Sequence, residues 1–451
     1  MTGPVSVPVT ISGDGPGEGP PTPPADVPLT FLVAAGVGLV LGGVAVALAA
    51  DRAVQWPGHP GVVSATHTVM LGFLTIGVLG ALHQFGPVVA GRRLRSVAVA
   101  RMTALLLIPG VWVLASGFAH SPSWMVRAGG TMTFVGVLLA AWNLSGPLAT
   151  RGADITVWGL RCSVALLVAT AAFGIVYAFD RTHGWFPLLQ NRVMAHAHLG
   201  LLGWLGLTYV AVAEKLWPMF LLAHRPSARS GTVAVACLAA GAPLLTVGLL
   251  FSRPLALIGG TIVGIGLAAH LTSLGGVLRH RQRRLGLLHA FVITGALALL
   301  TAAVLALVGG LAPLDAVDRP RVVAAEIASL SAWLGLAVIG HAHKIVPFIR
   351  WTTLFERGKA QRPDGTPLLF EDLYSGPAAV GTFVLCSTGF AAVIVGLLVS
   401  SSTIIVLGGL AVSVGGAIAV VNLATGVRLA TRGASEAVPV SNPLSRAGSM
   451  T

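Results

Sequence analysis

The chain alternates between long apolar stretches and short polar segments. Twelve apolar stretches hold about 18 or more residues, which at about 1.5 Å per residue is enough to cross a hydrocarbon core about 30 Å thick. Because lipid cannot satisfy backbone N–H and C=O groups, each stretch is predicted to be a helix, and the chain an all-α integral membrane protein. The predicted spans are approximately 29–50, 61–83, 99–118, 124–144, 156–178, 194–216, 231–251, 254–276, 287–310, 322–346, 376–399 and 402–424.

The two ends of the chain are more polar than its middle. Residues 1–28 are rich in Pro and Gly and have no basic segment before the first apolar stretch, which predicts a disordered tail and not a cleaved signal peptide. Residues 29–425 form the predicted twelve-helix membrane domain. Residues 426–451 are predicted to be a second disordered tail.

Charge is sparse and lies between the apolar stretches. The 451 residues are 55% hydrophobic and only 10% charged, with a mean hydropathy of +0.85, so lipid is the main solvent and partner. The net charge of +13 is not gathered with aromatic residues on a polar face, which argues against a nucleic-acid partner. Lys and Arg gather in the connections after every second span, such as 92–95, 279–284 and 350–362. Both termini are therefore predicted to be cytoplasmic, in a multi-pass protein of the inner (plasma) membrane.

An internal repeat relates the second, sixth and tenth spans. Aligning Phe73 with Trp204 and Trp333 needs no gaps and would divide the twelve helices into three pseudo-repeated groups of four. Chance is the alternative, because Leu, Gly and Pro coincide often in apolar helices. Three further sets of residues fall in one register: His67, His198 and Ile327; His83, Glu214 and His343; Pro87, Pro218 and Pro347.

Three histidines lie at the outer ends of the second and sixth spans: His67, His196 and His198. Imidazole inside a membrane is costly unless it is paired or liganded, and neutral imidazole is a common ligand for heme iron. Two residues of helix turn by about 200°, so His196 and His198 are expected to face two different sites, one of which could include His67. The alternative is that these rings only hydrogen-bond to helix ends or to water.

A second polar set lies at the inner ends of the same spans. His83, His341 and His343 could form a second metal site, and Glu214 with Lys215 could transfer protons. Alternatively, Glu214 and Lys215 extend to the membrane surface without a further role. The spacing does not choose between these possibilities.

The stretch 195–204, Ala-His-Ala-His-Leu-Gly-Leu-Leu-Gly-Trp, resembles a motif in the catalytic subunit I of heme-copper oxidases, closest to the C-type cytochrome c oxidases. NnrS proteins, membrane heme and copper proteins of the nitric oxide response, are a looser likeness. The oxidase resemblance implies that His196 faces a high-spin heme and that His198 holds a low-spin heme together with His67. It also implies a b-type heme and a redox partner protein.

The chain departs from the oxidase pattern at the copper site. The motif lies in the sixth span and not in the tenth, and the seventh span, 231–251, lacks the adjacent His pair that binds copper. Copper is therefore possible but unsupported, and a complete dinuclear centre is not expected.

Two functions of different classes fit this pattern. The first is a heme-binding membrane protein in electron transfer or in nitric oxide or oxygen handling, and thus a possible oxidoreductase. The second is a secondary transporter coupled to protons, metal ions or solutes, since repeated helices also occur there. Transporter sites usually lie at the midplane, whereas the histidines here lie nearer both membrane faces, which favours cofactor binding. The sequence leaves the oligomeric state open.

Overall fold

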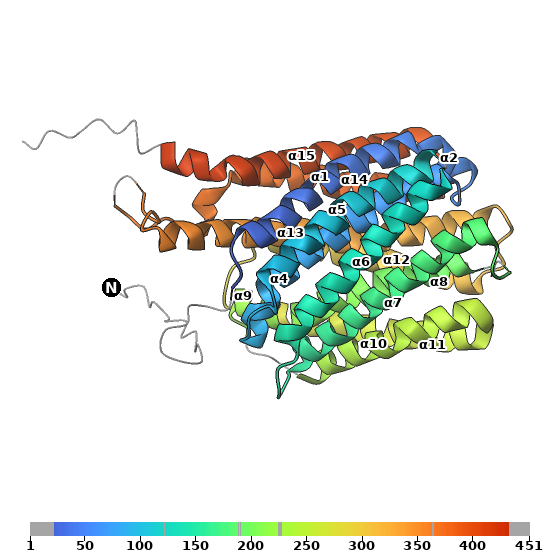
Figure 1. The fold of residues 1–451 in the computed structure, drawn as a ribbon, viewed down its shortest axis with the longest axis horizontal. Coiled ribbons are helices and arrows are strands. Elements are labelled where there is room, and N and C mark those ends of the chain that lie inside the picture. The colour runs from blue at the N-terminus through green and yellow to red at the C-terminus, as the bar shows by residue number, and fades with distance from the viewer. Residues whose placement is uncertain are drawn as a thin grey trace, which may run out of the picture.

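The computed structural model describes residues 22–432, except 121, 188, 190, 224–227 and 363–364, as a bundle of long helices (Figure 1). Most of each predicted tail lies outside the described residues. The elements are α1 (Asp26–Leu48), α2 (Ala50–Gln55), α3 (Pro60–His67), η1 (Thr68–Thr75), α4 (Ile76–Ala90), α5 (Val97–His120), α6 (Ser123–Leu148), α7 (Ile155–His183), α8 (Arg192–His198), η2 (Leu199–Gly206), α9 (Leu207–Leu221), α10 (Ala228–Phe251), α11 (Arg253–Arg279), α12 (Leu287–Leu311), α13 (Asp318–Glu356), η3 (Phe370–Leu373), α14 (Gly376–Leu398) and α15 (Ser402–Arg432).

Twelve helical runs in the described residues are long and apolar enough to cross a membrane, which confirms the predicted number. The second run joins α3, η1 and α4 (Pro60–Ala90), the sixth joins α8, η2 and α9 (Arg192–Leu221), and the tenth is α13. The first and last runs, α1 and α15, pack against each other along one edge of the bundle (Figure 1). The cytoplasmic placement of the termini stays a prediction.

The second, sixth and tenth helices form the centre of the bundle. In the most apolar stretch of each, 50%, 78% and 67% of the residues are buried, whereas no other transmembrane helix exceeds 44%. A helix that is apolar on all sides and buried belongs to a core, and the less buried helices present a lipid-facing side. The helices that carry the repeat are therefore also the helices that meet inside the protein.

Three contacts around the bundle axis confirm the repeat register. Trp204 donates its indole N–H to Oγ1 of Thr75, at 3.3 Å between the heavy atoms. Trp333 packs on Gly206, because a Cβ added to Gly206 would lie 3.4 Å from Cζ3 of the indole. Phe73 packs on Gly335 in the same way, with 3.4 Å between an added Cβ and Cε1 of the ring. In each case the aligned aromatic residue contacts the position two residues after the aligned aromatic of the next helix. These contacts close a ring with pseudo-threefold symmetry.

The backbones of the second and sixth helices depart from α geometry at equivalent places. The π-helical segments η1 and η2 begin directly after His67 and His198, which the repeat aligns. Both helices also end alike, because Gly91 and Leu222 adopt left-handed conformations and return their N–H groups to the carbonyls of Pro87 and Pro218. Since π turns in α-helices are frequent at functional sites, the shared segments direct attention to the two histidines.

The close packing of α1 on η1 depends on Gly38. A Cβ at this position would overlap the backbone carbonyl of Gly72, and a backbone carbonyl cannot turn aside as a side chain can. We expect Gly38→Ala to destabilise the protein by about 1–3 kcal/mol, the usual cost of overpacking. The measurement is thermal unfolding in detergent micelles. The matched control is Gly264→Ala in α11, where a Cβ would meet no atom within 4 Å, and equal transitions in the two variants would contradict the expectation.

Candidate functional site

His67 ends α3 and projects into the contact between the second and sixth helices. Its Nδ1–H donates to the carbonyl oxygen of Val63 at 2.8 Å. This hydrogen bond fixes the neutral tautomer and leaves the lone pair of Nε2 free for a ligand. The ring of Phe118 from α5 covers one side, with 4.9 Å between the ring centroids.

His196 lies beside His67. The two ring centroids are 6.4 Å apart and the ring planes differ by 20°. Phe173 of α7 contacts His196 edge to face at 5.4 Å, and the small residue Gly174 leaves room for the ring. Nδ1 of His196 is buried and has no hydrogen-bond partner. A buried nitrogen without a partner costs about 1–3 kcal/mol, which a bound ligand would offset.

The distance between the two ring centres is close to that of two imidazoles binding one metal ion. Two imidazole nitrogens on opposite sides of an ion, each about 2.0 Å from it, place their ring centres about 6 Å apart. The observed 6.4 Å matches this arrangement, and the donor set is the one that axial ligation of heme iron uses. The pair could therefore hold heme iron.

His198 faces the opposite side of the sixth helix and contacts α13. Its Nδ1–H donates to the carbonyl of Met194 at 2.8 Å, and its Nε2 lies 3.0 Å from Oε1 of Glu326. Both side chains are 8% exposed. Because the carbonyl already uses the Nδ1 proton, the Nε2–Oε1 contact holds one further proton, on the imidazole or on the carboxyl. Ligation of iron by His198 would require Glu326 to release Nε2, and the heme at His198 stays a prediction.

The structure therefore places His196 beside His67, and not His198 as the oxidase resemblance implies. Under the repeat register His67 and His198 are equivalent, so they face successive helix contacts and not each other. His67 instead contacts His196, which precedes His198 in the sixth helix. His198 contacts Glu326, which precedes the aligned Ile327 in the tenth helix. Sequence reasoning missed Glu326, although a carboxylate directly before Ile327 in an apolar span was a usable signal.

At the other end of the bundle, His83 and His343 occupy matching surroundings. Each donates its Nδ1–H to the carbonyl four residues earlier, at 2.7 and 2.9 Å. His83 stacks on Phe31 at 5.1 Å and His343 on Phe291 at 5.9 Å, and the phenylalanines are as far apart in sequence as the histidines. Nε2 of both rings is buried without a hydrogen-bond partner. The repeat thus extends to this end.

The structure does not assemble the predicted second metal site. His341 faces away from these rings and contacts Tyr209, with 6.4 Å between the ring centroids. The described residues contain no group of three or more His, Cys, Asp or Glu placed to hold one metal ion. The physical reason is the two-residue spacing of His341 and His343, which turns them to nearly opposite sides of α13, while His83 packs on α1.

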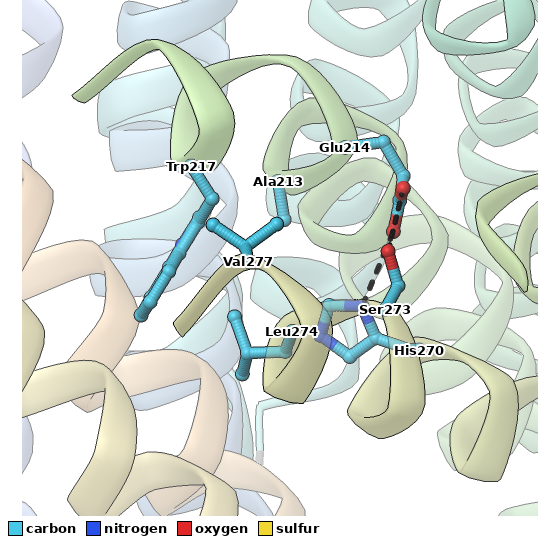
Figure 2. Close-up of a pocket in the computed structure, with 7 residues that line it drawn as sticks. All are labelled: Ala213, Glu214, Trp217, His270, Ser273, Leu274 and Val277. Atoms are coloured by element: carbon cyan, nitrogen blue, oxygen red, sulfur yellow. Dashed lines mark hydrogen bonds and ion pairs between the residues drawn. The ribbon is translucent and has the colours of Figure 1, made fainter. Parts of the chain in front are cut away.

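Glu214 and Lys215 turn to different neighbours. Lys215 forms a partly exposed ion pair with Asp154, with 2.9 Å between Nζ and Oδ2. Glu214 is buried and accepts a hydrogen bond from the hydroxyl of Ser273 in α11 at 2.9 Å (Figure 2). His270 lies inside α11 with 2% exposure, its Nδ1 3.9 Å from Oε1 of Glu214. Its depth within the span 254–276 was the signal that could have identified it.

The comparisons with known proteins reveal a shared fold. No family model matches the chain, and no curated protein matches its sequence. Among solved structures, the chain is similar to a heme-copper terminal oxidase dimer determined by cryo-EM, with 10% sequence identity and a TM-score of 0.62. The match covers 89% of this chain and 84% of that chain.

The arrangement of helices defines the class of protein. The chain is a multi-pass membrane protein that shares its fold with a chain of the heme-copper terminal oxidase, as the resemblance implies. At 10% identity the likeness concerns the fold alone. The looser likeness to NnrS proteins has no support in the comparisons and stays a prediction.

Proposed function

We propose that this protein binds heme in the membrane, where His67 and His196 would hold the iron, and that it acts in electron transfer. The observation that carries the proposal is the 6.4 Å spacing of the two imidazole rings, which is close to the spacing that one shared ion would give. The fold shared with a heme-copper terminal oxidase supports the proposal independently.

The surroundings of the pair suit a cofactor that exchanges electrons. When bound, heme supplies one-electron chemistry, and the protein sets its potential through ligands, hydrogen bonds and burial. The hydrogen bond from His67 to Val63 orients that ring, as carbonyl partners of ligating histidines do. Phe118 and Phe173 contact the imidazoles and exclude water.

Two axial imidazoles favour electron transfer over gas binding. With His67 and His196 both bound to the iron, oxygen or nitric oxide would find no free ligand position. Handling of either gas would need one histidine to leave the iron, or a second heme at His198. Copper has no support, because residues 231–251 contain no histidine, and we propose a redox partner protein that delivers or removes the electron.

An absorption spectrum tests the proposal. The purified protein is expected to show b-type heme bands in the reduced-minus-oxidised difference and about one iron per polypeptide or more. Iron is measured by mass spectrometry on the same sample, with copper and zinc measured beside it. A folded protein without heme bands, even when expressed with added heme precursor, would sink the proposal. Proton-coupled solute uptake by iron-free protein in vesicles would instead favour the transporter.

A further inference from the structure

A small cavity lies between α9 and α11, away from the histidine pair. Glu214, Ser273 and His270 line one side of it, and Trp217 and Leu274 line another (Figure 2). Its volume is about 10 Å³. A cavity of this size holds about one water molecule, provided that polar partners are present.

Two nitrogens that line this cavity, Nδ1 of His270 and Nε1 of Trp217, are buried without a hydrogen-bond partner. Oε2 of Glu214 accepts from Ser273, while Oε1 lies 3.9 Å from Nδ1 of His270, which is too long for a hydrogen bond. Nδ1 of His270 is buried and has no partner. Figure 2 shows the carboxyl, the hydroxyl and the ring facing one another. One water in the cavity would bridge the carboxyl to the orphaned nitrogen.

We propose that Glu214, Ser273 and His270 form a buried site for one water molecule and one exchangeable proton. The proton moves from the carboxyl of Glu214 to the bridging water, while the water releases another of its protons to Nδ1 of His270. One O–H bond breaks and one N–H bond forms, the water is restored, and nothing is oxidised or reduced. The site is independent of the proposed heme.

Gly231 of α10 shapes the third side of the site. A Cβ at this position would overlap Oε2 of Glu214, so the carboxyl rests directly against the backbone of α10. The absence of a side chain here lets three helices close around one carboxyl. A glycine at a close approach of this kind has a packing reason.

The site continues toward the centre of the bundle. His270 contacts Tyr209 at 5.5 Å, and the buried hydroxyl of Tyr209 has no hydrogen-bond partner. Tyr209 in turn contacts Trp333, the aligned aromatic of α13, and His341. Besides Tyr209, the other charged or titratable groups on α9, α10 and α11 are Lys215, which pairs with Asp154, and Arg229, Cys237, Arg253 and Arg279. His289 of α12 contacts Trp217 at this end of the cavity.

Infrared difference spectroscopy across about pH 4 to 10 tests the site on the purified full-length protein. The wild type is expected to show a carboxylic C=O band that shifts in D2O and disappears as the pH rises. Glu214→Gln is expected to remove this band completely. His270→Phe is expected to change the frequency of the band, because the carboxyl then has no imidazole with which to share its proton.

Three controls make the result decisive. Glu326→Gln removes the other buried carboxyl discussed above and is expected to leave the Glu214 band in place. Gly231→Ala is expected to displace the carboxyl and alter the band without changing any titratable group. His67→Ala is expected to retain it, so that loss of heme and loss of this site are distinguishable. A Glu214 band insensitive to pH and D2O in folded protein, or one that changes only with added sodium, would overturn the proposal.

Discussion

Replacing His67 or His196 by alanine is expected to lower the heme content of the purified protein by at least about tenfold in either variant. Outer-shell partners alone change metal affinity by about 10- to 100-fold, so a lost ligand sets at least that effect. The two variants should behave alike, because one ion needs both imidazoles. Heme is measured per polypeptide by the pyridine hemochrome assay, alongside iron by mass spectrometry.

His120→Ala is the matched control, since His120 lies at an exposed helix end and its Nδ1–H donates only to the carbonyl of Ser116. Heme content is expected to stay at the wild-type value in this variant. The oxidase resemblance instead pairs His67 with His198, and so predicts that heme is lost in His198→Ala. Heme lost in His198→Ala but retained in His196→Ala would show that His198, and not His196, is the partner of His67.

Much of the fold could be predicted from hydrophobic patterning. The twelve apolar stretches gave the number of helices, because a helix in lipid must satisfy its own backbone. The alignment of Phe73, Trp204 and Trp333 also held, and the three residues contact successive helices around the bundle axis. Patterning could not reveal η1 and η2, because an apolar run of this kind is equally compatible with α and π turns.

The candidate site was harder to predict, because the depth of a histidine in the membrane does not determine which residue it contacts. Sequence spacing placed His67, His196 and His198 at one level of the bundle, and opposite directions for the last two followed from helix geometry. The partner of each depends on how helices pack laterally, and a repeat register does not contain that information. Residues that the repeat aligns face different helix contacts, and so they do not touch each other. The residues that do touch occupy different positions in the alignment, such as His196 with His67 and Glu326 with His198.

Glu326→Ala is expected to destabilise the protein by about 3–5 kcal/mol, the cost of leaving one member of a buried pair without its partner. The proton that Nε2 of His198 and Oε1 of Glu326 share would then have no acceptor inside the protein. Glu326→Gln is expected to cost only about 1 kcal/mol, since the amide N–H can donate to the lone pair of Nε2. Unfolding in mixed detergent micelles measures both variants.

A double-mutant cycle with His198→Ala separates this pair from an ordinary contact. Hydrogen bonds between membrane helices couple by about 0.6 kcal/mol on average, so a coupling of about 2 kcal/mol or more between His198 and Glu326 identifies a shared buried proton. Glu371→Ala is the control, because Glu371 is 75% exposed in its pair with Lys344, and such pairs contribute at most about 1 kcal/mol. A coupling no larger than this control would mean that His198 is free to leave Glu326, which would restore it as a candidate heme ligand.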